Sequence, residues 1–352
     1  MRIAFVFTTG GPRTWNDASL DKGLGGSETL MVLYARAFAS MGHEVTCFAP
    51  IPHEGNHTRE WCHGVSWSHC ATAAYQTGYD VVVSLRSPLP LTGCRAPVRA
   101  LLAVDQTCDI LPLARADKLC NLVITISQHQ TDRYTALYHL PPELVLTSSA
   151  GVDWDAFSIP AAKSGCIYAS TPERGLSHFA HLWPRIVKRV PDARLTVTSG
   201  FELYGFTPDA CERYGKPHYD TLKGLKGVTY SGPLTREAYQ KAMMGAAVMA
   251  YPSVYDEMCC IAALEAAASG TVIVTTDRGA LSERVVNGET GYLIAGEPGT
   301  PAYDDAFVAK VTDLLTDPET RRTMGKKARA LAAPHDYEVL ASEWLHRFKD
   351  ML

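Results

Sequence analysis

Two carboxylates lie eight residues apart in a run of small apolar residues. They are Glu257 and Glu265 within Tyr251–Gly270, where a Pro-Ser pair precedes the first and a Ser-Gly pair follows the second. Because an unpaired buried charge is costly, carboxylates in such surroundings need polar partners, and sugar hydroxyls or a ribose diol would suit them. We expect one helix to carry both glutamates. Phosphate could then be received by the free amides at the helix start, those of Met258, Cys259 and Cys260.

The flanks of this run and several other segments resemble a known family. The run, followed by Thr276–Glu283 and Asn287–Leu293, resembles the donor-binding half of glycosyltransferase family 4. Further segments match the family in the same order along the chain: Met1–Phe7, Gly25–Glu28, Gly42–Cys47, Asn121–Ser127, Ala150–Phe157, Tyr168–Leu176 and Arg194–Gly200. The resemblance implies an α/β protein of the GT-B fold, in which two Rossmann-like, doubly wound domains face each other across a cleft.

The same resemblance implies roles for individual residues. Glu257 is expected to bind the hydroxyls of the donor sugar, and Glu265 the ribose diol. Arg174 stands where the family usually has lysine, and a guanidinium there would neutralise the leaving diphosphate. The other expected donor-binding residues are Gly25 and Gly26, whose backbone can approach the phosphates closely, Gly200, and Leu234, whose turn should cradle the base.

Two positions depart from the family pattern. The family's usual partner arginine, five residues before Arg174, falls at Ala169. Asp105 and Gln106 occupy the place where the family often has His-Asp, so Asp105 either accepts a hydrogen bond from donor or acceptor or caps a loop. These departures leave open a non-catalytic sugar-nucleotide-binding protein. A nucleotide-sugar 2-epimerase of the same fold is the alternative enzyme.

The sequence does not favour a metal site. Six potential ligands cluster at spacings that match no closed tetrahedral pattern: His53, His57, Cys62, His63, His69 and Cys70. No Asp-x-Asp pair stands where a metal diphosphate would be held. We therefore expect metal-independent chemistry, with no cofactor other than the donor substrate.

Apolar runs alternate with helical patterns in two series, which predicts two doubly wound α/β units. The expected strands are Ile3–Phe7, Val45–Phe48, Val81–Val83, Val98–Val104 and Leu122–Ile126, then Ile167–Ala169, Arg194–Thr198, Val228–Tyr230, Ala247–Ala250 and Thr271–Thr275. We expect an acceptor-binding domain over residues 1–157, a nucleotide-sugar-binding domain over 158–336, and a last helix over 337–352 that packs back toward the first domain. The loops at Thr8–Lys22 and Ile51–Gln76 should select the acceptor.

Composition limits the partners. The net charge is −4, and mixed charges argue against nucleic acid or an anionic membrane as an acceptor held by charge. No apolar run reaches the roughly 18 residues of a membrane span, and no signal-peptide pattern opens the chain, so a cytoplasmic location is expected. The sequence thus predicts a retaining glycosyltransferase that uses a nucleoside-diphosphate sugar, with the sugar, base, acceptor and oligomeric state left open.

Overall fold

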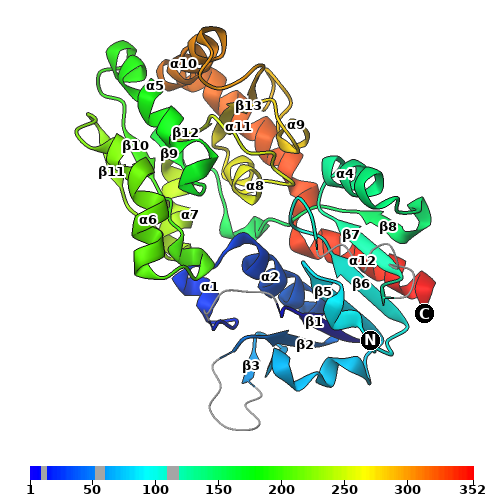
Figure 1. The fold of residues 1–352 in the computed structure, drawn as a ribbon. Helices are drawn as coiled ribbons and strands as arrows, with labels where there is room; N and C mark the ends of the chain where they lie inside the picture. The colour runs from blue at the N-terminus through cyan, green and yellow to red at the C-terminus, as the bar shows by residue number, and fades with distance from the viewer. Residues whose placement is uncertain (9–13, 52–59, 109–118) are drawn as a thin grey trace. The chain divides into compact units, whose positions relative to one another are not determined.

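The computed structural model describes residues 1–8, 14–51, 60–108 and 119–352. The chain divides into two compact units (Figure 1). Unit 1 comprises Met1–Gly151 and His335–Leu352, and unit 2 comprises Val152–Pro334. The first division falls a few residues before the boundary expected at 157, and the last helix belongs to unit 1.

The sheet of unit 1 has eight strands in the order β3-β4-β2-β1-β5-β6-β7-β8. All neighbours are parallel except the antiparallel pair β3–β4. The strands are β1 Arg2–Val6, β2 Glu44–Ala49, β3 Glu60–Cys62, β4 Val65–His69, β5 Val81–Leu85, β6 Val98–Leu102, β7 Leu122–Thr125 and β8 Val145–Thr147. Because β3 and β4 extend the sheet, part of the segment expected as an acceptor loop at Ile51–Gln76 is regular structure instead.

The sheet of unit 2 has six strands in the order β11-β10-β9-β12-β13-β14, and all its pairings are parallel. The strands are β9 Ser164–Tyr168, β10 Leu195–Val197, β11 Val228–Tyr230, β12 Ala246–Tyr251, β13 Val272–Thr276 and β14 Gly291–Ile294. Numbered within the unit, this order is 3-2-1-4-5-6, which is that of a doubly wound nucleotide-binding sheet. The expected fold class, with two doubly wound α/β units, is confirmed.

Helices connect the strands in both units. The α-helices are α1 Ser19–Lys22, α2 Gly26–Ser40, α4 Gln128–Tyr138, α5 Leu176–Arg189, α6 Pro208–Tyr219, α7 Arg236–Gly245, α8 Ile261–Ala268, α9 Leu281–Arg284, α10 Pro301–Thr316, α11 Pro318–Ala332 and α12 Tyr337–Met351. The short 3₁₀ turns are η1 Cys70–Thr72, η2 Ala74–Gln76, η3 Leu89–Leu91, η5 Pro142–Leu144, η6 Trp154–Ala156, η7 Pro172–Arg174, η8 Glu202–Tyr204, η9 Asp220–Leu222 and η10 Ala333–His335.

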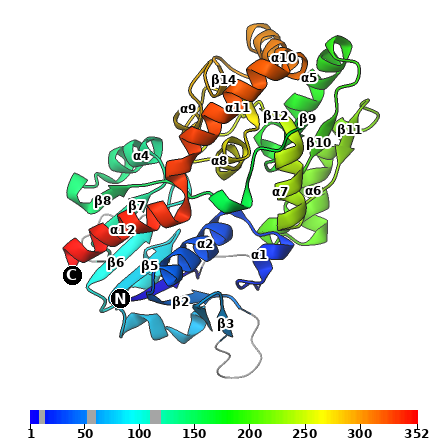
Figure 2. The same ribbon diagram turned by 180° about the vertical axis from the view of Figure 1, so that it is seen from behind.

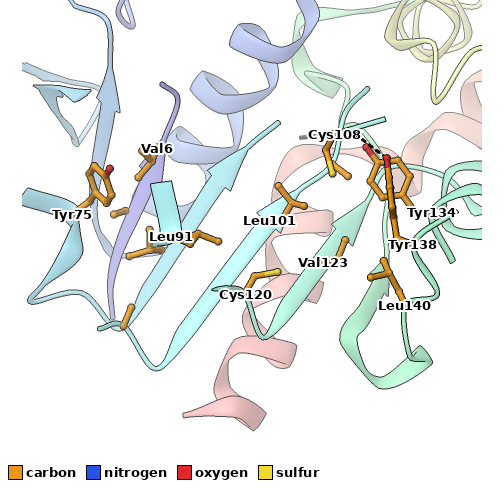
Figure 3. Close-up of a cluster of buried hydrophobic side chains, with 14 of the residues drawn as sticks. Val6, Tyr75, Leu91, Leu101, Cys108, Cys120, Val123, Tyr134, Tyr138 and Leu140 are labelled. Atoms are coloured by element: carbon orange, nitrogen blue, oxygen red, sulfur yellow. Dashed lines mark hydrogen bonds between the residues drawn. The ribbon is translucent and has the colours of Figure 1, made fainter. Parts of the chain in front are cut away.

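Both faces of the unit 1 sheet are covered. On one face, Val6, Leu101 and Val123 join a buried cluster (Figure 3). Within this cluster the Cys108 N–H donates to the Tyr138 hydroxyl at 3.2 Å. Alternate residues of a strand point to opposite faces, so Phe5 points the other way and contacts Phe38 of α2 at 5.8 Å between ring centroids. The sheet is therefore buried on both sides, as parallel sheets are.

Helix α12 completes the second face of unit 1. It lies beside α2 (Figure 2), and the rings of Trp344 and Tyr34 stack with centroids 4.1 Å apart. Leu340, Leu345 and Phe348 on the same side of α12 are buried. A side chain at Gly151 would collide with Tyr337, because a Cβ there would lie 2.4 Å from the Tyr337 ring. The last helix is thus an integral layer of unit 1.

Unit 2 contains a partly buried lysine just before β9. The Lys163 ammonium donates to the carbonyls of Met244 and Ala246 at 2.5 and 3.1 Å, and to Thr271 Oγ1 at 2.8 Å. These acceptors suit a charged amine, but burial, together with nearby Arg321, lowers the pKa of Lys163 to about 7.

The lowered pKa of Lys163 predicts a pH-dependent stability. An unfolded lysine titrates near its ordinary value of about 10.4, so between pH 7 and that value the unfolded chain binds the extra proton. The free energy of unfolding should therefore rise with pH across this window. Urea unfolding of wild type and Lys163→Met at pH 7 and pH 9.5 should show a larger rise for wild type. Equal rises would contradict the depressed pKa.

Candidate functional site

The strand order of unit 2 reverses between β9 and β12, and the candidate site lies there. Ligands of doubly wound sheets bind beyond the carboxyl ends of the strands at such a reversal. After β9 the chain runs into η7, which ends at Arg174, and after β12 it runs through Pro252 to Glu257. The topology therefore brings two of the expected catalytic residues to one place.

Arg174 and Glu257 form an ion pair. The Arg174 Nη1 lies 3.1 and 3.3 Å from the two Glu257 carboxylate oxygens, and the side chains are 25% and 5% exposed. The Tyr251 hydroxyl donates to Glu257 Oε1 at 2.5 Å. Burial is the largest single influence and disfavours the charge of Arg174, but the Glu257 carboxylate together with the nearby tyrosines outweighs it, so the pKa of Arg174 is raised. The Arg174 side chain is partly accessible, whereas the Glu257 side chain is buried. Ala169, at the family's other arginine position, is buried just after β9.

The expectation that one helix carries both glutamates is wrong. Helix α8 begins at Ile261, and its N-cap Cys260 has a φ of 64°, in the left-handed region. A right-handed helix cannot extend through a residue in the left-handed conformation. Glu257 therefore lies in the loop that precedes α8. The amides of Met258, Cys259 and Cys260 are loop amides as well, and the free amides of the first helical turn start at Ile261.

The segment that follows β13 contacts the backbone of the loop that carries Glu257. The Ala280 N–H donates to the Glu257 carbonyl at 2.8 Å. A Cβ at Gly279 would lie 2.6 Å from that carbonyl oxygen and 2.8 Å from the Glu257 nitrogen, and the φ of Gly279 is 57°. The buried Arg284 donates from Nε to the Cys259 carbonyl at 3.1 Å. Backbone contacts on two sides thus fix the loop.

Glu265, inside α8, has protein partners on both of its oxygens. Arg236 Nη1 donates to Oε1 and the Tyr239 hydroxyl donates to Oε2, each at 2.6 Å. The side chains of Arg236 and Glu265 are 14% and 6% exposed. Sequence reasoning missed both partners, which come from α7, although an arginine and a tyrosine three residues apart on a helix share a face.

Gly200 and Leu234 belong to neighbouring turns at the edge of the same sheet. A Cβ at Gly200 would lie 2.6 Å from Pro233 Cγ. The Thr198 hydroxyl donates to the Gly232 carbonyl at 3.1 Å, which ties the two turns together. The turn containing Leu234 follows the third strand of unit 2, as expected, and the backbone of both turns lies beyond the carboxyl ends of β10 and β11.

The remaining expected site residues lie in unit 1. Gly25 is the N-cap of α2 and Gly26 its first residue, so the glycine pair opens this long helix as expected. Asp105 follows β6 and forms an ion pair with Arg86, with 3.1 Å between Arg86 Nε and Asp105 Oδ2. Arg86 directly follows β5 with a φ of 68°. No sequence pattern singled out Arg86, because its partner is 19 residues away.

The His/Cys cluster is partly a hydrogen-bonded network around Asp17. His63 Nδ1 lies 2.8 Å from Asp17 Oδ1 and 3.3 Å from the Cys62 thiol. Arg36 donates to both Asp17 oxygens, at 2.5 and 2.9 Å, and burial is outweighed by these bonds, so the pKa of Asp17 is lowered. The Arg36 guanidinium therefore already balances the charge of the Asp17 carboxylate. His53 and His57 lie outside the described residues, and His69 caps η1 through its Nδ1.

Comparison with known proteins gives sequence matches over part of the chain. Residues 167–331 match the family model described as glycosyl transferases group 1. D-inositol 3-phosphate glycosyltransferase of Kribbella flavida is 35% identical over 127 residues, which cover 36% of this chain and 28% of that enzyme. Glycogen synthase of Mycobacterium tuberculosis is 26% identical over 171 residues, covering 48% and 38%. The chain thus spans well under half of the length of these relatives.

Solved structures match the whole chain. Sucrose-phosphate synthase from Thermosynechococcus elongatus superimposes with a TM-score of 0.76 at 17% identity, covering 99% of this chain and 98% of that one. Anabaena HepE in complex with UDP-glucose has a TM-score of 0.73 at 15% identity, covering 99% and 100%. At such identities the likeness shows the shared GT-B fold. Among the described residues, the helices are all too short or too polar to cross a membrane.

Proposed function

We propose that this chain, whose residues 167–331 belong to the glycosyl transferases group 1, is a retaining glycosyltransferase that uses a nucleoside-diphosphate sugar without a metal. The observation that carries the proposal is the Arg174–Glu257 pair at the strand-order reversal of unit 2. It combines a cation suited to a leaving diphosphate with a carboxylate suited to sugar hydroxyls, at the place where doubly wound sheets bind nucleotides.

The chemistry requires one bond to break and one to form at the anomeric carbon. The bond from this carbon to the diphosphate oxygen breaks, and the acceptor oxygen attacks on the same face. The leaving oxygen takes the acceptor's proton, so no protein nucleophile is needed. Arg174 supports the negative charge that grows on the diphosphate, and such preorganised support lowers the barrier. Glu257 orients the sugar through its hydroxyls.

Glu265 is proposed to bind the ribose while it stays paired with Arg236 and Tyr239. A carboxylate has about four lone-pair sites, and the two protein bonds leave acceptor capacity on both oxygens. Gly200, Leu234 and the amides of the 258–260 loop are proposed to line the rest of the donor site in unit 2. The backbone at Gly25 and Gly26, where α2 of unit 1 begins, is proposed to bind donor phosphate. Asp105, held by Arg86 in unit 1, is proposed to accept a hydrogen bond from a sugar or acceptor hydroxyl.

Nucleotide binding in the presence of a chelator tests the function. Because HepE was solved with UDP-glucose, UDP is the first ligand to try, followed by ADP and GDP. A ligand at 100 times its Kd stabilises the folded state by about 2.7 kcal/mol, so the melting temperature should rise in EDTA. The matched control is the nucleoside monophosphate, which lacks the leaving phosphate and should stabilise less.

Two results would contradict the proposal. If none of these diphosphates at millimolar concentration raised the melting temperature, the donor site would be wrong. If stabilisation required magnesium or manganese, metal independence would be wrong. Release of free sugar from the bound donor without an acceptor separates an enzyme from a pure binding protein, which would show binding and no release.

A further inference from the structure

The guanidinium of Arg174 is held on its face as well as at its edge. Its Cζ lies 4.1 Å from the centroid of the Tyr255 ring, while its Nη1 contacts the Glu257 carboxylate. At this distance a guanidinium is attracted to the ring face. The two contacts differ in kind, because the carboxylate occupies N–H donors and the ring occupies none.

The backbone brings Tyr255 to this position through several close contacts. The Val254 N–H donates to the carbonyl of Arg174 itself at 3.1 Å. Ser253, which is buried, bonds both the Tyr255 N–H and the Tyr255 carbonyl through its hydroxyl, at 3.2 and 3.1 Å. Gly175 has a φ of 136°, and a Cβ there would lie 2.3 Å from the Pro252 carbonyl oxygen. The two segments are therefore in direct backbone contact, and the ring has a fixed place relative to the arginine.

The contacts of Arg174 with Glu257 and with Tyr255 have different fates when a donor binds, and a looser ion pair also joins its Nε to Glu173 Oε1 at 3.8 Å. Glu257 is proposed to bind sugar hydroxyls, so its carboxylate is shared between the sugar and the arginine. The Tyr255 ring contacts the face of the guanidinium and uses none of its N–H donors, so these donors can bond phosphate oxygens when a donor binds. A flexible arginine without such a support would lose more conformational freedom on meeting the diphosphate.

We propose that Tyr255 is a positioning residue that holds Arg174 in the plane needed to support the leaving diphosphate. This inference rests on the proposed function. The ring acts through Arg174 and does not itself touch the reacting atoms. Its contribution should appear in the rate of the chemical step and should depend on the presence of Arg174.

The test is single-turnover kinetics with saturating donor on Tyr255→Leu and Tyr255→Phe. Phenylalanine keeps the ring face, so its rate should stay within about threefold of wild type. Leucine keeps apolar bulk without a ring face and should lower the rate about tenfold, within the range expected for a cation–π contact, while the Kd for the nucleoside diphosphate changes less than threefold. Tyr214→Leu is the matched control, because Arg213 lies 5.8 Å from that exposed ring in the same unit; its rate should be unchanged.

A double-mutant cycle separates positioning from a merely structural role. In an Arg174→Ala background, Tyr255→Leu should have no further effect on the rate, because nothing remains to be positioned. An equal tenfold loss in both backgrounds would overturn the inference, as would an equal loss in Tyr255→Phe. If instead Arg174→Ala alone left the rate unchanged, the proposed role of Arg174 would fail, and this result is distinguishable from a failure at Tyr255.

Fluorinated phenylalanines at position 255 supply a second series if Tyr255→Leu does not fold. Each fluorine withdraws electron density from the ring face and weakens its attraction for a cation, while the shape of the ring is nearly kept. The single-turnover rate should fall stepwise with the number of fluorines. A rate independent of fluorination would overturn the proposal.

Discussion

Replacing Arg174 with alanine should lower the single-turnover rate of sugar transfer by about 10²–10³-fold, comparable to the loss of one preorganised donor from a transition-state site. Charge on the diphosphate grows as its bond to the sugar breaks, so the loss should appear in kcat more than in donor affinity. Arg174→Lys should recover part of the rate, because a point charge remains without the two-pronged geometry. Rapid-quench measurements with saturating donor give the rate directly.

The matched control is Arg185→Ala. Arg185 lies on α5 in the same unit, and its side chain is more exposed than that of Arg174 and pairs with the exposed Asp305. Its loss removes the same charge from unit 2 and should leave the rate within about twofold of wild type, as expected for a surface ion pair. An Arg174→Ala rate within threefold of wild type would show that other groups hold the diphosphate.

The Glu265→Gln substitution should reduce stability as well as nucleotide binding. The NH₂ group of the glutamine side chain would face one of the two hydrogen-bond donors, Arg236 or Tyr239. The Arg236 charge would also lose its carboxylate partner. Breaking a buried ion pair in this way costs about 3–5 kcal/mol, which urea unfolding measures. If the ribose also binds Glu265, nucleoside-diphosphate affinity should fall by about tenfold or more, since a charge-assisted bond is lost.

A neighbouring pair and a double mutant control this result. Glu237→Gln disrupts the pair of Glu237 with Lys241 on the same helix α7, where both side chains are exposed, and it should leave the unfolding midpoint nearly unchanged. Arg236→Met combined with Glu265→Gln should destabilise less than the sum of the single changes, because both charges are then gone. Additive effects would show that the pair is not coupled.

Local patterns in the sequence were enough to predict much of the fold. Alternating apolar runs located most of the parallel strands in both units, because this pattern depends on near neighbours in the chain. Gly25–Gly26 marked the start of α2 for the same reason. The strands β3, β4, β8 and β14 were missed, since a three-residue strand such as Glu60–Cys62 carries little periodic signal.

The residues of the candidate site could be predicted from the sequence, but the side chains they pair with in the structure could not. Arg174 and Glu257 were both found, but they are 83 residues apart, and their contact arises from the strand order of unit 2. The pairs of Glu265 with Arg236 and of Asp105 with Arg86 likewise depend on tertiary packing. The start of α8 was misplaced because the left-handed backbone of Cys260 leaves no trace in the run of apolar residues that surrounds it.

The glycine behind the Glu257 loop has a consequence for engineering this protein. Gly279 contacts no proposed substrate group, yet any side chain there would collide with the backbone of Glu257. A variant library designed only from residues that face the ligand would overlook this position. In a library randomised along the whole chain, substitutions at residue 279 would disrupt the Glu257 loop. Redesign of sugar selectivity should therefore keep residue 279 constant and diversify side chains whose backbone is free of such contacts.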